Sequence, residues 1–240
     1  MKKPDRVWAE INLDHIAHNI SSIKEKAGDV KIAAVIKADG YGHGAIEIAQ
    51  TLCENGVYML VVATLDEGIN LRINGITAPI LVLGYIRPDR LEQVIENNLA
   101  ATITNLDMAK NFSNTAEKLE KTLYAHIKVD TGMHRVGFSY DDKESLTTAL
   151  GLKNIHYSGI FSHFSTADEE DLSYTDLQYK RFLEMLESIK EEGFDIALRH
   201  ICNSGAVILH PDKYLDMIRP GIIIYGLYPS QYCKEHDGLK

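Results

Sequence analysis

Short apolar runs rich in β-branched residues alternate along the chain with longer stretches that carry apolar residues at helical spacing. A continuous run such as IAAVI is typical of a strand that is buried on both faces. Eight such strands separated by helices predict a parallel (β/α)8 TIM barrel, and a doubly wound open sheet is the alternative because periodicity does not show closure. The runs are residues 31–36, 59–63, 80–84, 100–104, 123–130, 156–164, 196–202 and 215–221.

Helix signals lie between the runs. Thr64 stands three residues before Glu67, which is the spacing of a capping box at a helix start. Gly56 follows an amphipathic stretch and is a candidate C-cap. Residues 173–193 form the longest stretch, and their apolar positions make one helical stripe. These signals support a helix between successive strands.

The two ends of the chain fit the barrel less well. Residues 7–13 alternate like a strand but precede the first barrel helix, and residues 231–240 have no periodic pattern. We therefore expect residues 1–13 to contain an N-terminal strand that pairs with a domain this chain lacks. Residues 14–230 are expected to form the barrel, and residues 231–240 to lead toward the absent domain.

Composition narrows the class of protein. The chain has 240 residues, of which 45% are hydrophobic, enough for one large core. Its formal net charge of -9 argues against nucleic acid and an anionic membrane as main partners. The start has no apolar segment of a secretory signal, and no apolar run approaches the roughly 18 residues of a membrane span. Three widely spaced cysteines without a C-x-x-C motif indicate a reducing compartment, so we expect a cytoplasmic protein, and no metal site is predicted.

Polar and ionisable residues follow five of the eight predicted strands. The carboxyl ends of the strands of a (β/α)8 barrel meet at one face, where its active sites lie. Such side chains are costly to bury unless they are paired or used. The residues at these ends are Lys37, Lys128, Asp130, Ser162, His163, Asn203, Ser204 and Arg219.

Each of these residues also has a simple structural interpretation. Lys37 can extend to solvent at the barrel rim, and His163 can be a hydrogen-bonded core histidine. Ser204 can be the N-cap of the following helix. Two arginines can be ion-pair partners of nearby aspartates, Arg135 of Asp130 and Arg219 of Asp216. The placement of all of them on one face favours an active site.

Their chemistry together favours a pyridoxal phosphate (PLP) site. A lysine among apolar strand residues is disfavoured in its charged form, and a neutral amine can form a Schiff base. Ser204 at a helix start and the backbone N–H groups after Arg219 could hold a phosphate, and the flat ring of His163 could lie against an aromatic ring. An aldolase-type barrel, which uses a strand-end lysine without PLP, is the competing interpretation.

Five motifs resemble those of alanine racemases: AAVIKADGYGHG, KVDTGMHRVGF, GIFSHFSTAD, HICNSGAV and DMIRPGIIIYGLYPS. EINLDHIAHNI near the start is also similar, so the resemblance covers essentially the whole chain in order. It implies a fold-type III PLP barrel and an isomerase that interconverts L-alanine and D-alanine. In that family the reaction supplies D-alanine for cell-wall peptidoglycan, and the enzyme is a homodimer.

The resemblance also implies roles for individual residues. Lys37 corresponds to the lysine that binds PLP covalently and acts as a catalytic acid and base. Arg135 corresponds to a contact on the carboxylate side of the substrate, and Lys128 to a lysine that is carbamylated in some members. The implied cofactor-binding residues are Lys37, Tyr41, His163, Asn203, Ser204, Arg219, Gly221 and Ile222.

One expected element has no counterpart in the sequence. In the family a second catalytic base, a tyrosine, lies in a C-terminal β-domain and comes from the partner subunit. No GYADG-like segment of that domain occurs here, so we expect a fragment with little or no activity alone. The alternatives are a stand-alone PLP-binding barrel of the homeostasis type, a serine racemase, and a barrel that only supports assembly.

Overall fold

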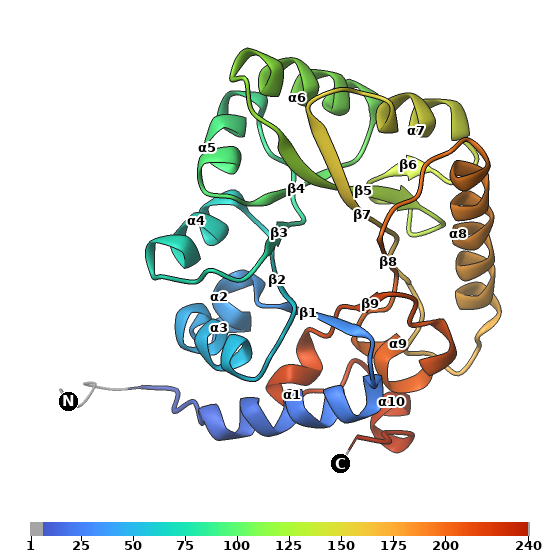
Figure 1. Ribbon diagram of the computed structural model, residues 1–240. Helices are drawn as coiled ribbons and strands as arrows, with labels where there is room; N and C mark the ends of the chain where they lie inside the picture. Colours follow the sequence, from blue (N-terminus) through green and yellow to red (C-terminus); the bar gives the residue numbers. More distant parts are fainter. Residues whose placement is uncertain (1–6, 240) are drawn as a thin grey trace.

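The computed structural model describes residues 7–239 and contains a ring of parallel strands surrounded by helices (Figure 1). Neighbouring strands pair in the order β8-β7-β5-β4-β3-β2-β1-β9. Each lies in one of the eight predicted runs, with β7 beginning one residue earlier. Their bounds are β1 (Lys31–Val35), β2 (Met59–Val62), β3 (Ile80–Val82), β4 (Ala100–Ile103), β5 (Leu123–Asp130), β7 (Ile155–Phe161), β8 (Leu198–His200) and β9 (Met217–Ile218).

The ring closes between its last two strands. On one side β9 pairs with β1, with Ile218 opposite Ile32. On the other side the backbone N–H of Asp216 donates to the carbonyl of Arg199 at 3.1 Å. The N–H of Arg219 donates likewise to Cys202, at 2.9 Å. The (β/α)8 barrel is therefore confirmed over the open doubly wound sheet.

Helices surround the barrel, and two of the sequence signals mark the start of α4 and the end of α3. Thr64 and Glu67 form the predicted capping box at the start of α4. Gly56 follows the end of α3 and has a positive φ of 75°. The helices are α1 (Leu13–Ala27), α2 (Lys37–Gly42), α3 (Ala45–Glu54), α4 (Leu65–Ile73), α5 (Leu91–Glu96), α6 (Leu106–Lys118), α7 (Lys143–Leu150), α8 (Ser173–Glu191), α9 (Ser204–Leu209) and α10 (Gln231–Glu235), with 3-10 turns η1 (Pro88–Arg90), η2 (Pro211–Lys213) and η3 (Ile222–Tyr225).

The core has two layers. The larger one lies between the strands and the helices, and it includes Phe112, Phe164 and Phe182, which are fully buried. A smaller apolar cluster comes from the opposite face of β1, β2, β3 and β9, the inside of the barrel: Ala33, Val35, Met59, Val61, Leu81 and Met217. Only one part of the barrel interior is thus filled by this apolar cluster.

The ends of the chain differ from the prediction. Residues 7–12 form no strand, and Leu13 is already the first residue of α1, which is capped by Asn12. A strand needs a neighbour for its backbone hydrogen bonds, and no strand of the described residues lies beside 7–12. The expected pairing with another domain stays a prediction, and residues 1–6 lie outside the described range.

The segment after the barrel contains structure that the sequence pattern did not predict. Residues 231–235 form α10, which begins after the N-cap Ser230 and buries Cys233 completely.

A short strand that the sequence did not predict, β6 (Phe138–Ser139), pairs with β5 at Val129 and Asp130. No helix within residues 7–239 is long and apolar enough to cross a membrane.

Candidate active site

A cavity of about 260 Å³ lies at the carboxyl ends of the barrel strands. The structure brings together all ten predicted site residues, because each of them lines this cavity: Lys37, Tyr41, Lys128, Arg135, His163, Asn203, Ser204, Arg219, Gly221 and Ile222. The sequence did not single out the other lining residues, which are Val35, Leu83, Thr102, Val136, Phe161, Asp168, Gly205 and Pro229.

Lys37 begins a tight left-handed turn. The φ angles of Ala38, Asp39, Gly40 and Tyr41 lie between 52° and 60°. Left-handed backbone costs roughly 1–2 kcal/mol for each residue other than glycine, so the turn needs support. Glu67 supplies some of it, because its Oε1 accepts from the N–H of Ala38 at 2.8 Å. Asp39 Oδ1 likewise accepts from the first N–H of α3 at 2.8 Å.

Tyr41, Ser204 and Gly221 meet at one end of the cavity. The N–H of Gly221 donates to Ser204 Oγ at 2.9 Å. A Cβ atom at Gly221 would lie only 2.7 Å from Tyr41 Oη, so the absence of a side chain is what admits the tyrosine. Two hydroxyls and a backbone N–H, which donates to Ser204 Oγ in this structure, are therefore grouped where an anion could accept hydrogen bonds from them. The N-cap of α9 is Asn203 and not Ser204, since Asn203 Oδ1 accepts from Ala206 N at 3.1 Å.

Arg219 is buried and held by acceptors that carry no negative charge. Its Nη2 donates to the Ser162 carbonyl at 2.7 Å and lies 3.2 Å from His163 Nδ1. The predicted ion pair with Asp216 is wrong, because Asp216 binds Arg199 at 2.6 Å instead. Burial lowers the pKa of Arg219 to about 10, so it still carries its charge at neutral pH.

Two buried histidines, His200 and His126, form a row of hydrogen bonds that starts at Arg219. Arg219 Nη1 lies 2.6 Å from His200 Nδ1, and His200 Nε2 lies 2.9 Å from His126 Nδ1. Because arginine can only donate, His200 Nδ1 accepts, and its proton lies on Nε2. That proton is donated to His126, whose own proton then lies on Nε2, a buried atom without a partner among the described residues. Burial, and next the charge of Arg219, lower the pKa of His126 to about 3, so it is neutral.

Lys128, and not Lys37, is the desolvated lysine of the cavity. Lys128 is only 4% exposed, and its Nζ donates to the Val129 carbonyl at 2.7 Å. Burial, followed by the charge of Arg219, lowers the pKa of Lys128 to about 7. Lys37 is only partly buried at the start of its turn, which leads it away from the apolar strand.

Arg135 is exposed at the cavity mouth, on the loop that follows β5. Asp130 does not form the predicted ion pair with it. The Oδ1 atom of Asp130 instead accepts from the N–H groups of Gly132 and His134, at 2.9 and 3.1 Å. Asp130 therefore shapes the loop that presents Arg135.

The cavity is cationic although the chain is acidic. Its described lining includes four lysines and arginines, Lys37, Lys128, Arg135 and Arg219, against one acid, Asp168. The whole chain carries a formal net charge of -9. A cationic pocket with hydroxyl and backbone donors at one end favours an anionic ligand.

Comparison with known proteins identifies the family. A family model for the N-terminal domain of alanine racemases matches residues 11–229. The chain belongs to the alanine racemase family. The alanine racemase of Carboxydothermus hydrogenoformans is 44% identical over 225 residues, which cover 94% of this chain and 61% of that protein. The alanine racemase of Desulforamulus reducens is 45% identical over 234 residues, which cover 96% and 63%.

Solved alanine racemases have the same fold. The structure from Clostridium difficile 630 in complex with cycloserine has a TM-score of 0.93 at 41% identity. The match covers 97% of this chain and 65% of that one. The structure from Bacillus anthracis with bound L-Ala-P has a TM-score of 0.91 at 37% identity, covering 97% and 61%. This chain thus spans less than two thirds of the length of these alanine racemases.

Proposed function

We propose that this chain is the cofactor-binding barrel of a PLP-dependent alanine racemase, which interconverts L-alanine and D-alanine. The observation that carries the proposal is the convergence of ten residues of the alanine racemase pattern on one cationic cavity. The D-alanine would serve peptidoglycan synthesis. We propose the cytoplasm as its compartment, and the free thiols of Cys53, Cys202 and Cys233 support that choice.

The residues present fit PLP. Tyr41, Ser204 and the Gly221 N–H make the donor cluster expected for its phosphate, and the missing Cβ at Gly221 keeps the space between them open. Asn203, His163 and Ile222 line the same cavity, which leaves room for a flat ring against the His163 side. Lys37 would hold the cofactor covalently. PLP, when bound, supplies an electron sink for a carbanion at the α-carbon of an amino acid.

Arg219 would face the pyridine nitrogen. An arginine has no acceptor and keeps its proton, so it donates a hydrogen bond and leaves that nitrogen unprotonated. Arg219 would thereby make PLP a weaker electron sink than an aspartate would, and so restrain side reactions such as transamination. The buried neutral His200 supports this role, because its Nδ1 accepts from Arg219 and fixes the direction of donation.

Racemisation also needs acid and base groups on both faces of the α-carbon. Lys37 would remove or deliver the proton on one face, while Arg135 holds the substrate carboxylate. Tyr41 is the one tyrosine in the described lining, and it belongs to the phosphate end. We propose that the second base is a tyrosine of a C-terminal domain, contributed by the partner in a homodimer. This chain alone would then racemise alanine poorly or not at all.

Borohydride trapping tests the cofactor assignment. The chain is mixed with PLP, reduced with borohydride and mapped by peptide mass spectrometry, with Lys37→Ala as the matched control. We expect a pyridoxyl adduct on Lys37 in the wild type and none at that position in the control. An unlabelled Lys37 in folded wild-type protein would refute the PLP site.

A turnover assay tests the expected lack of activity. The same preparation, supplied with PLP and L-alanine, should show almost no D-alanine. A kcat in the usual enzymatic range, roughly 1–1000 per second, would refute the need for a second domain.

A further inference from the structure

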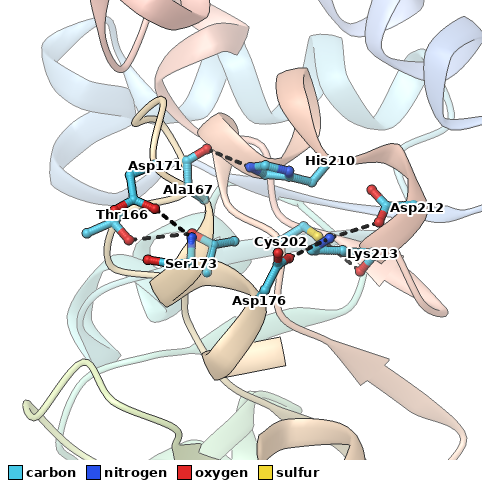
Figure 2. A network of polar contacts seen from close by, with 10 residues as sticks. Thr166, Ala167, Asp171, Ser173, Asp176, Cys202, His210, Asp212 and Lys213 are labelled. Carbon is cyan, nitrogen blue, oxygen red and sulfur yellow. Dashed lines mark hydrogen bonds and ion pairs between the residues drawn. The ribbon is translucent and has the colours of Figure 1, made fainter. Parts of the chain in front are cut away.

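Helix α8 is firmly anchored beside the active-site face. Near its start, Asp176 lies 3.1 Å from the Nζ atom of Lys213, which also contacts Asp212 at 2.8 Å. In the segment before the helix, the carbonyl of Ala167 lies 3.2 Å from His210 Nε2. Figure 2 shows these contacts, which join Ala167 to His210 just before η2 and Asp176 of α8 to Lys213 at the end of η2. The first turns of α8 therefore form a fixed support.

Gln178 lies on this support and is completely buried. Its Oε1 accepts from both the N–H and the Oγ of Ser165, each at 2.9 Å. Its Nε2 donates to the carbonyl of His163 at 3.1 Å and lies 3.5 Å from Thr131 Oγ1. A backbone N–H must meet the amide oxygen and a carbonyl must meet the amide nitrogen, so the orientation of the amide is unambiguous. All four hydrogen-bonding capacities of the side chain are used.

The partners of Gln178 belong to the two segments that leave β5 and β7. Strand pairing between β5 and β7 ends with Lys128 opposite Phe161, so beyond these residues the two strands no longer bond to each other. One of them begins with Thr131 and carries Arg135, and the other carries His163. Thr131 Oγ1 also lies 2.8 Å from Ser162 Oγ, which joins the same two segments. The Gln178 amide thus joins the two segments beyond the last residues at which β5 and β7 pair.

Two neighbours on α8 hold the β5 side of this connection. Arg181 Nη1 donates to the Thr131 carbonyl at 3.0 Å, and Tyr174 Oη donates to the Gly132 carbonyl at 2.7 Å. Both bond to the loop after β5 and neither bonds to the segment after β7. Among the described residues of α8, Gln178 is the one that is hydrogen-bonded to both segments.

We propose that Gln178 is a positioning residue, which fixes His163 and the loop carrying Arg135 relative to each other and so shapes the cofactor site. The inference rests on the proposed function, because the benefit of this geometry is the binding of PLP. Gln178 does not touch the cavity itself and acts through the backbone of His163 and through Thr131.

The test compares Gln178→Glu with the wild-type chain. An introduced carboxylate has almost the same shape and still accepts from Ser165, but it has no N–H for the His163 carbonyl. Gln93→Glu is the matched control, because Gln93 is exposed and lies on a different helix, α5. If the buried change prevents folding, Thr131→Val removes one partner of the amide with little change in shape. PLP affinity is measured by absorbance titration on samples that circular dichroism shows to be folded.

A positioning role predicts that Gln178→Glu binds PLP about tenfold more weakly, as expected for one buried hydrogen bond, while Gln93→Glu binds like the wild type. Thr131→Val should weaken binding about threefold. A second readout is the ¹⁵N resonance of His163 Nδ1 without PLP, which should shift in Gln178→Glu and not in the control. A folded Gln178→Glu chain with wild-type PLP affinity and an unchanged His163 resonance would overturn the inference, even if its unfolding midpoint fell.

The two proposals fail in different ways. A wild-type chain that binds no PLP would refute the proposed function, whatever happens at Gln178. The His163 resonance of the PLP-free protein then decides the inference by itself. A shift would support the connection, and an unchanged resonance would overturn it.

Discussion

Replacing Lys128 with methionine should stabilise the protein at neutral pH. Methionine fills a similar volume without a charge, and Lys128 is only 4% exposed. Lowering the pKa of Lys128 from 10.5 to about 7 corresponds to a penalty of about 5 kcal/mol for holding the protonated amine in the folded state. The variant loses the hydrogen bond to the Val129 carbonyl, which offsets about 1–2 kcal/mol. We expect a net gain of about 3 kcal/mol near pH 6.5.

The gain should depend on pH in a defined direction. An unfolded lysine titrates near 10.5 and the folded Lys128 near 7, so between these values the unfolded chain binds more protons. The penalty on the wild type is therefore complete below about pH 7 and disappears as the pH rises toward about 10.5. Lys128→Met should lose most of its advantage across that interval.

Urea unfolding at a series of pH values measures this difference. Subtracting the wild-type free energy of unfolding from that of Lys128→Met at each pH removes the titrations that both proteins share. Lys121→Met is the control, because Lys121 is exposed and should give a small difference at every pH. A difference for Lys128→Met that stays constant between about pH 6.5 and pH 9.5 would refute the perturbed amine.

The same experiment addresses carbamylation of Lys128, since the corresponding lysine is carbamylated in some members of the family. The neutral amine would add to carbon dioxide with loss of a proton, and the resulting anion would face Arg219 and Arg135 instead of repelling them. Bicarbonate should then raise the urea midpoint of the wild type and leave Lys128→Met unchanged. Intact mass measurement would show the added carbon dioxide. Equal midpoints with and without bicarbonate would contradict this proposal.

Three further substitutions test the packing of the site and of a helix start. Gly159→Ala should destabilise the fold by about 2–4 kcal/mol in urea, because a Cβ would lie 2.5 Å from the His126 ring. Gly221→Ala should displace Tyr41 and weaken PLP binding about tenfold in an absorbance titration, with a change in unfolding free energy below about 1 kcal/mol. Thr64→Ala removes the capping box of α4 and should cost about 1 kcal/mol in urea.

The barrel was predictable because several of its strands, among them β1, β2 and β3, are continuous apolar runs typical of strands buried on both faces. The capping box at Thr64 and Glu67 was predictable for a similar reason, since it needs only residues close in sequence. The left-handed turn after Lys37 was not. Its conformation depends on Glu67, a residue that lies 29 positions from Ala38. Local sequence does not show a support that comes from another part of the chain.

The hydrogen-bonded pair His126 and His200 corresponds to a pattern in the sequence of β5. In β5 the residues Tyr124, His126, Lys128 and Asp130 alternate with apolar residues, although the strand is buried almost throughout. A strand that alternates while buried on both faces must have a polar inner surface. The bond from His200 to Arg219 could not be inferred in this way, because it depends on how three strands meet inside the barrel. The same applies to Gln178, whose partners lie 13 to 47 residues away in sequence.

The cationic side chains of the site lie next to the polar part of the barrel interior. The inner face is apolar along β1, β2 and β3, where Ala33, Val61 and Leu81 pack, and it is polar on β5 and β8. The buried charge of Arg219 lies on this polar side, where carbonyls and the neutral rings of His163 and His200 accept its hydrogen bonds without neutralising it. Burial lowers the pKa of Lys128, and the uncompensated charge of Arg219 beside it lowers that pKa further. These unfavourable electrostatics coincide with the cavity, and an anionic ligand bound there would relieve them.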